Sequence, residues 1–172
     1  ILGTGVGGGI VVRGELLNGA NAIAGEWGHN PLPWPQPGEL PGPACYCGRH
    51  GCIETWISGT GFAADHARLN GGHWRGEQIV LAADSGDATA QASVERYEQR
   101  LARALAHVIN VLDPQVIVLG GGLSSLRRLY RTVPGFWKPW IFSDDIRTRL
   151  VQAQFGDASG VRGAAWLWPE AA

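Results

Sequence analysis

The apolar residues follow a helical spacing most regularly between residues 87 and 112. Positions three or four apart would share one buried helical face: Val94, Tyr97, Leu101, Leu105, Val108 and Leu112. Asp87 suits the N-cap of this helix, and the Asp113-Pro114 step would end it. We therefore expect one long helix that lies with one side on the core.

Shorter apolar patterns predict strands. The run QVIVLGGGLS, residues 115–124, has no polar alternation, which is typical of a strand buried on both faces that leads into a loop at a site. VQAQF, residues 151–155, is expected to be an outer strand. Near the start, residues 10–17 predict a β-hairpin with its turn at Arg13-Gly14, beside a glycine loop.

Two further segments have helical patterns that are interrupted. Residues 53–69 look helical, with a possible turn at SGTG, residues 58–61. Residues 127–149 predict one or two helices, which Pro134 and Pro139 would break.

The remaining segments complete the predicted fold class. Residues 156–168 predict a capped closing helix, and residues 31–43 contain six prolines and should be irregular. A hairpin, a long helix, a central strand and further helices predict an α/β domain. This order makes the expected β-structure mixed rather than purely parallel.

Composition narrows the class of protein. The 172 residues are 45% hydrophobic and 17% charged, as expected for one soluble globular domain. The net charge is −1 without a basic stripe, and no apolar run approaches membrane-spanning length, so neither nucleic acid nor membrane is an expected partner. No signal peptide is recognisable, so a cytoplasmic location is expected. Because the chain contains no methionine, we expect it to be a fragment whose upstream sequence is missing.

Three cysteines lie close together in the pattern C-x-C-x4-C. Thiolates that share a zinc ion must converge on one point, and the glycines between Cys45, Cys47 and Cys52 allow a tight loop. The alternative of free cysteines in a reducing compartment would favour isolated positions, and a redox switch would favour C-x-x-C. The spacing therefore predicts a structural zinc site, with His29 preferred to His50 as the fourth ligand.

Two glycine-rich segments lie beside predicted strands, one before the hairpin at residues 10–17 and one after the apolar run that begins at residue 115. The backbone N–H groups of GTGVGGG, residues 3–9, could surround phosphate oxygens, although tight hairpin turns also use glycine. This segment lacks the Lys-Ser/Thr end of a P-loop, which excludes that mechanism, and it does not run from strand into helix. Together with VLGGGLS, residues 118–124, it could hold a nucleotide from two sides.

Glu26 and Glu54 bracket the cysteine cluster. Glutamates on loops are often solvated charges, and that interpretation stays open. If a metal ion draws His29 and Cys52 together, however, the two glutamates must approach each other. Their carboxylates could then accept hydrogen bonds from several hydroxyls of a polyol.

At this point the residues carry a resemblance to a known family. The motifs GTGVGGG, GEWGH, CYCGRHGCIE, SGTGF, DPQVIVLGGGLS and GDASGVRGAA occur in the order typical of the ROK family of repressors, open reading frames and kinases. The resemblance covers residues 3–165. AIAGEWGHNPLPW and ASGVRGAAWLWP look most like the bacterial fructokinase branch, and the N-acetylglucosamine kinases are near relatives.

The resemblance implies an actin/hexokinase-like (ribonuclease H-like) fold of two lobes that close on ATP, Mg²⁺ and a hexose. Residues 1–172 would be the C-terminal lobe with a zinc loop at 25–54, and the N-terminal lobe would be missing. The implied zinc ligands are His29, Cys45, Cys47 and Cys52, and the implied sugar-binding residues are Glu26, His29 and Glu54. The implied ATP-binding residues are Thr4, Gly5, Val6, Gly7, Gly8, Gly9, Gly120, Gly121 and Gly122.

Members of the family carry an Asp-x-Gly-Gly-Thr phosphate loop and an aspartate that acts as general base on the sugar hydroxyl. Neither motif occurs in this sequence, so we expect no catalytic residue in this chain, the base to lie upstream, and the fragment alone to be inactive. Phe155 also departs from the family, whose members often have histidine there, but no predicted site depends on it.

The resemblance thus predicts an ATP-dependent fructokinase that forms fructose 6-phosphate. The alternatives are an N-acetylglucosamine or other hexose kinase, a sugar-responsive transcriptional repressor, and a zinc-stabilised interaction domain without catalysis. A homodimer is also expected, in which Trp137 and Trp140 could serve an interface as easily as a core.

Overall fold

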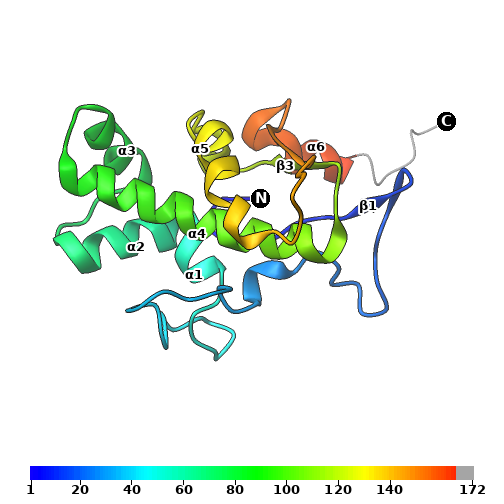
Figure 1. Cartoon of the computed structure of the whole chain (residues 1–172), viewed down its shortest axis with the longest axis horizontal. Helices are drawn as coiled ribbons and strands as arrows, with labels where there is room; N and C mark the ends of the chain where they lie inside the picture. The colour runs from blue at the N-terminus through cyan, green and yellow to red at the C-terminus, as the bar shows by residue number, and fades with distance from the viewer. Residues whose placement is uncertain (166–172) are drawn as a thin grey trace.

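The computed structural model describes residues 1–165, and helix α4 (Ala88–Leu112) runs through the middle of the molecule (Figure 1). The predicted N-cap is confirmed, because the Asp87 carboxylate accepts a hydrogen bond from the Ala90 N–H at 2.8 Å. The predicted buried face is also confirmed from Val94 to Leu105. Leu112, in contrast, is 43% exposed, because the last turn extends beyond the core.

Three helices pack on the first half of α4. They are α1 (Glu54–Ile57), α2 (Gly59–Asn70) and α3 (Gly76–Asp84). The predicted interruption at SGTG is real: Ser58 lies between α1 and α2, and its hydroxyl caps α2 by accepting from the Gly61 N–H. The sequence pattern did not predict α3, although its buried residues Ile79, Val80 and Ala83 have helical spacing.

Strands β3 (Val116–Leu119) and β4 (Arg149–Gln152) pair in parallel, with Ile117 opposite Leu150. The expectation that the first strand is buried on both faces was wrong. Leu119 is buried, but Val118 is 54% exposed. Successive side chains of a strand point to opposite faces, and among the described residues the helices cover only one of them.

The crossover between these strands contains α5 (Leu129–Phe136) and the 3-10 helix Lys138–Trp140. Pro134 was expected to break the helix but lies inside α5, where the buried Leu129 and Val133 hold the segment on the core. After β4 come the 3-10 helix Gly156–Ala158 and α6 (Ser159–Ala165). The rest of the predicted closing helix, residues 166–168, lies outside the described residues.

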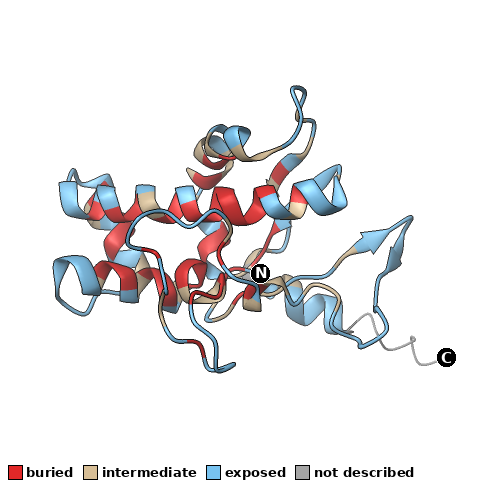
Figure 2. Ribbon diagram, turned by 60° about the horizontal axis from the view of Figure 1, so that its bottom comes forward, coloured by how far each residue is buried: buried red, intermediate tan, exposed pale blue. Residues whose placement is uncertain are grey.

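The predicted hairpin is formed by β1 (Val11–Val12) and β2 (Glu15–Leu16), which are antiparallel. It extends away from the body, and its residues are exposed (Figures 1 and 2). Antiparallel and parallel pairings both occur, as predicted, but in two separate two-stranded sheets rather than in one mixed sheet.

The proline-rich segment at residues 31–43 is irregular, as predicted, and is attached to α4. The Glu39 carboxylate is 8% exposed and accepts hydrogen bonds from Arg100 and Arg103, each at 2.8 Å. Trp140 stacks on Trp34 of the same segment, whereas Trp137 lies in the core. No helix in the described part of the chain is long and apolar enough to cross a membrane.

Candidate functional site

The cysteine turn is closed by backbone hydrogen bonds. The Cys45 N–H donates to the Arg49 carbonyl at 2.8 Å, and the Gly48 N–H donates back to the Cys45 carbonyl at 3.0 Å. Gly48 and Gly51 have φ of 85° and 69°, a conformation that glycine adopts without strain. This local structure turns the three thiols toward one point.

His29 joins the three thiols from the 3-10 helix Trp27–His29. One side-chain nitrogen or sulfur atom from each of His29, Cys45, Cys47 and Cys52 lies within 4.8 Å of every other. His50, the other candidate for the fourth position, is exposed and belongs to the backbone bridge with Ala44. The structure therefore brings together the four residues that the sequence indicated as zinc ligands.

Two of the distances within this cluster match those between neighbouring ligands of a tetrahedral zinc ion. His29 Nδ1 is 3.5 Å from Cys45 Sγ, and Cys47 Sγ is 3.6 Å from Cys52 Sγ. Zinc–sulfur and zinc–nitrogen bonds of about 2.3 and 2.0 Å place neighbouring tetrahedral ligands about 3.5 to 3.8 Å apart. The residues present thus match the size and the soft character of a zinc site.

The thiols differ in acidity. A hydrogen bond from the Arg49 backbone N–H is the main cause that lowers the pKa of Cys47 to about 7. Burial is the main cause that raises the pKa of Cys52 to about 12, and its Sγ lies 3.5 Å from the His29 carbonyl oxygen, to which the thiol donates. Several thiolates this close repel one another, so a bound cation would be needed to ionise them all.

Glu54 is the first residue of α1 and contacts the first glycine loop. Its Oε2 accepts a hydrogen bond from the Val6 N–H at 2.8 Å, and a Cβ at Gly5 would lie 2.5 Å from that oxygen. Glu26 precedes the 3-10 helix of His29 and is exposed. The Val6 N–H, one of the groups expected to face ATP, is therefore directed to Glu54 instead.

The first glycine loop also packs on the GEWGH segment, backbone against backbone. A Cβ at Gly28 would lie 2.0 Å from the Val6 carbonyl oxygen, and one at Gly25 would lie 2.1 Å from that of Gly8. Only glycine permits approaches this close. The glycines thus join the expected phosphate loop directly to the expected sugar-binding segment.

The two glycine loops meet through Leu2. The Leu2 N–H donates to the Gly120 carbonyl at 2.7 Å, and the Leu2 carbonyl accepts from the Leu123 N–H at 3.1 Å. Around Gly7 and Gly122, by contrast, no atom would contact an added Cβ within 4 Å. Both loops therefore lie in one region and keep an open side on which a nucleotide could bind.

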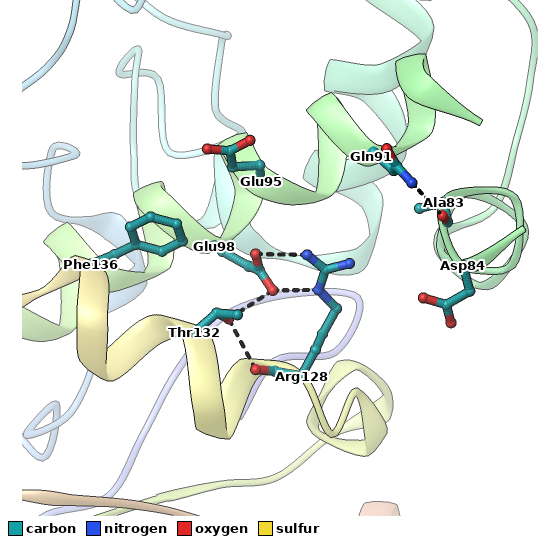
Figure 3. A pocket seen from close by; sticks show the side chains of 8 residues that line it. All are labelled: Ala83, Asp84, Gln91, Glu95, Glu98, Arg128, Thr132 and Phe136. Atoms are coloured by element: carbon teal, nitrogen blue, oxygen red, sulfur yellow. Dashed lines mark hydrogen bonds and ion pairs between the residues drawn. The ribbon is translucent and has the colours of Figure 1, made fainter. Parts of the chain in front are cut away.

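A hollow of about 510 Å³ lies between α3, α4 and α5, and none of its residues was predicted as a site. Figure 3 shows its Glu98 carboxylate held by Arg128 at 2.6 Å and by Thr132 at 2.8 Å. The hydrogen bond to Glu98 is the main cause that raises the pKa of Arg128. Glu98 and Arg128 are thus paired with each other across the hollow, which indicates a structural contact between α4 and the start of α5.

Sequence reasoning missed Tyr46 beside the cluster and the two arginines that hold the proline-rich segment. Tyr46 contacts His29, and its position between Cys45 and Cys47 was the signal in the sequence that could have pointed to it. Arg100 and Arg103, which hold Glu39, lie three residues apart on the helix, a spacing that could have indicated a shared partner.

The glycine loops, the parallel β3–β4 pair and the helices on one side of it define an α/β lobe of the actin/hexokinase class. Residues 1–171 match the ROK family, and the chain belongs to this family. The predicted family and fold class are therefore confirmed.

Curated relatives are kinases of an amino sugar. The N-acetyl-D-glucosamine kinase of Yersinia enterocolitica is 39% identical over 171 residues, and that of Photobacterium profundum is 41% identical. Each match covers 97% of this chain and 56% of the relative. The chain thus spans a little over half the length of these relatives.

Solved structures share the fold. A ROK family glucokinase from Streptomyces griseus, in complex with glucose and AMPPNP, has a TM-score of 0.82 at 28% identity. The match covers 96% of this chain and 58% of the glucokinase chain. A ROK hexokinase from Thermus thermophilus has a TM-score of 0.81 at 29% identity, covering 95% and 53%. A ROK family transcriptional regulator, a homologue of the E. coli MLC protein, has a TM-score of 0.72 at 28% identity, covering 88% and 40%.

Proposed function

We propose that the complete protein transfers a phosphoryl group from ATP to a hydroxyl of a hexose or N-acetylhexosamine, with N-acetyl-D-glucosamine as the first candidate. The observation that carries this proposal is the orientation of His29. Its Nδ1 lies among the thiols at 3.5 Å from Cys45 Sγ, which leaves Nε2 on the opposite side of the ring for a polyol. One imidazole can thus connect a metal centre to a sugar site.

The identity of the sugar is revised from the sequence-based expectation. The resemblance of short motifs favoured fructose, whereas relatives that match across 97% of the chain are N-acetyl-D-glucosamine kinases. Agreement over the whole chain outweighs agreement over two short segments. We therefore prefer the amino sugar and keep fructose as the competing substrate.

The proposed roles follow from the contacts. His29 and the three cysteines would hold a zinc ion, whose chemistry would be to cross-link the loop rather than to react. Glu26 and Glu54 would accept hydrogen bonds from sugar hydroxyls, and Nε2 of His29 would donate one. The open sides of residues 4–9 and 120–122 would face ATP and Mg²⁺. The Val6 N–H would not contribute, because it already donates a hydrogen bond to Glu54.

Phosphoryl transfer depends chiefly on positioning, charge neutralisation and a base. We propose that this chain supplies the positioning and that the general-base aspartate lies outside it. Residues 1–172 alone should therefore not turn over ATP. The homodimer and the cytoplasmic location stay predictions.

A coupled ADP-release assay on the complete protein tests the proposal. N-acetyl-D-glucosamine, fructose, glucose and mannose are compared in parallel, and a reaction without sugar is the blank. We expect sugar-dependent release, highest in kcat/KM with N-acetyl-D-glucosamine. Release with none of the four sugars would refute the kinase proposal, and a preference for fructose would refute the choice of sugar.

A sugar-responsive regulator is the second candidate, because the solved ROK family regulator shares the fold over 88% of this chain. The sequence before residue 1 would discriminate between the two. A helix-turn-helix there would favour the regulator, and an Asp-x-Gly-Gly-Thr phosphate loop without one would favour the kinase.

A further inference from the structure

Tyr46 lies between two cysteines of the cluster and contacts His29 on the side away from the sulfurs. Its hydroxyl oxygen is 2.8 Å from His29 Nε2, and the two rings meet edge to face with centroids 4.9 Å apart. Tyr46 is nevertheless 84% exposed. Water surrounds most of this side chain, so it can leave His29 by rotation about its own torsions without disturbing the core.

The contact uses the same chemistry that a sugar would use. When Nδ1 of His29 faces a cation, the ring proton is on Nε2, which then donates to the Tyr46 oxygen. A sugar hydroxyl would accept the same hydrogen bond. The Tyr46 hydroxyl therefore offers His29 Nε2 the same kind of hydrogen-bond acceptor as a sugar hydroxyl would.

We propose that Tyr46 occupies, in the sugar-free protein, the position at His29 Nε2 that a sugar hydroxyl takes in the complex. Tyr46 must then turn away before the sugar binds, so its hydroxyl lowers sugar affinity. The inference rests on the proposed function, because it requires Nε2 of His29 to face the sugar. Tyr46 is by this account a residue that sets affinity and takes no part in the chemical step.

Calorimetric titration of the complete, zinc-loaded protein with N-acetyl-D-glucosamine in the absence of ATP tests this inference. Tyr46→Phe keeps the ring and removes the competing oxygen. We expect the Kd to fall by roughly 2- to 10-fold, the equivalent of one net hydrogen bond. Tyr46→Ala should lower it at least as far. Tyr130→Phe is the matched control, because Tyr130 hydrogen-bonds to the Ser124 carbonyl away from the cluster, and should leave the Kd unchanged.

The outcomes separate this inference from the function beneath it. An unchanged Kd for Tyr46→Phe would overturn the competition, and a higher Kd would show that Tyr46 contacts the sugar directly. Loss of zinc from Tyr46→Phe, measured by metal analysis, would show instead that the hydroxyl supports the cluster. A wild-type protein that binds none of the four hexoses would overturn both proposals.

Discussion

Gly28 and His29 are neighbours that serve different parts of the site. Gly28 lets the GEWGH segment approach the first glycine loop, because its missing side chain leaves room for the Val6 carbonyl oxygen. His29 directs Nδ1 to the thiols and Nε2 to Tyr46. A change at either residue should therefore act through a different physical cause.

Gly28→Ala should destabilise the protein by steric conflict. An alanine Cβ would lie 2.0 Å from the Val6 carbonyl oxygen, so backbone must move, at a cost of roughly 1 to 3 kcal/mol in the free energy of unfolding. Gly135→Ala is the matched control, since nothing lies within 4 Å of its added Cβ, and should be near neutral. Urea unfolding of the complete protein measures both, and equal midpoints would contradict the expectation.

Metal analysis tests the identity of the four ligands. The purified protein should contain about one zinc ion per chain, and Cys47→Ser and His29→Gln should each abolish it, because three ligands leave a tetrahedral structural site incomplete. His50→Gln should keep the zinc, since His50 is exposed beside the cluster without belonging to it. A folded wild-type protein without metal would refute the zinc site.

At the scale of elements, one carboxylate fastens the proline-rich segment to α4. Glu39 accepts from both Arg100 and Arg103, and Arg100 also pairs with Asp65 of α2 at 2.9 Å. The Arg100 guanidinium lies 4.2 Å from the centroid of the Trp56 ring on α1. This network joins the segment that leads to the cysteine turn with three helices.

Glu39→Ala should destabilise the fold strongly, because it leaves two arginines buried without this partner. Removing one member of a buried ion pair costs roughly 3 to 5 kcal/mol in the free energy of unfolding. Asp145→Ala breaks a pair with Arg147 that is exposed on both sides and should cost less than about 1 kcal/mol. Chemical unfolding compares the two variants, and similar losses would show that burial of the Glu39 network does not matter.

The same network predicts acid sensitivity. Burial alone would raise the pKa of Glu39, but hydrogen bonds from Arg103, Gln36 and Arg100 outweigh it and lower the pKa below its ordinary value of 4.5. The Asp65 pKa is likewise lowered, since Arg100 and Arg68 outweigh burial. A carboxyl with a lowered folded pKa stabilises fully above its ordinary pKa and loses this contribution as the pH falls through the folded value.

Unfolding free energies measured between pH 3 and 7 check this expectation. Stability should be level near pH 6 and fall below about pH 4.5, where the unfolded state begins to take up protons. In Glu39→Ala this fall should be smaller, because one of the carboxylates is absent. An identical slope in the variant and the wild type would contradict the role of Glu39.

At the scale of the molecule, one small region collects the ends of several elements. The loop before β1, the loop after β3 and the start of α1 meet there through Leu2, Gly120 and Glu54. The cysteine turn is connected to the same region by His29. The cysteine–histidine cluster, the Glu54 carboxylate and the glycine loops therefore lie in one region although they come from distant parts of the sequence.

Local patterns predicted the local structure well and the burial less well. The helix after Asp87 and the hairpin were predicted because their signals, a cap and a turn, act over a few residues. No element was predicted for residues 70–86, which contain α3. The predicted burial of Val118 was wrong, because the exposure of a strand residue depends on which elements cover the strand and not on the strand's own residues.

Short-range chemistry in the chain was enough to define the family motifs, the cysteine turn and the type of metal that fits it. Those features depend on residue type and on spacings of a few positions. Only the tertiary structure shows the orientation of His29, the hydrogen bond from the Val6 N–H to Glu54, and the contact of Tyr46 with His29 Nε2. Each of these joins segments that are 16 to 48 residues apart, and such contacts arise only when the helices pack.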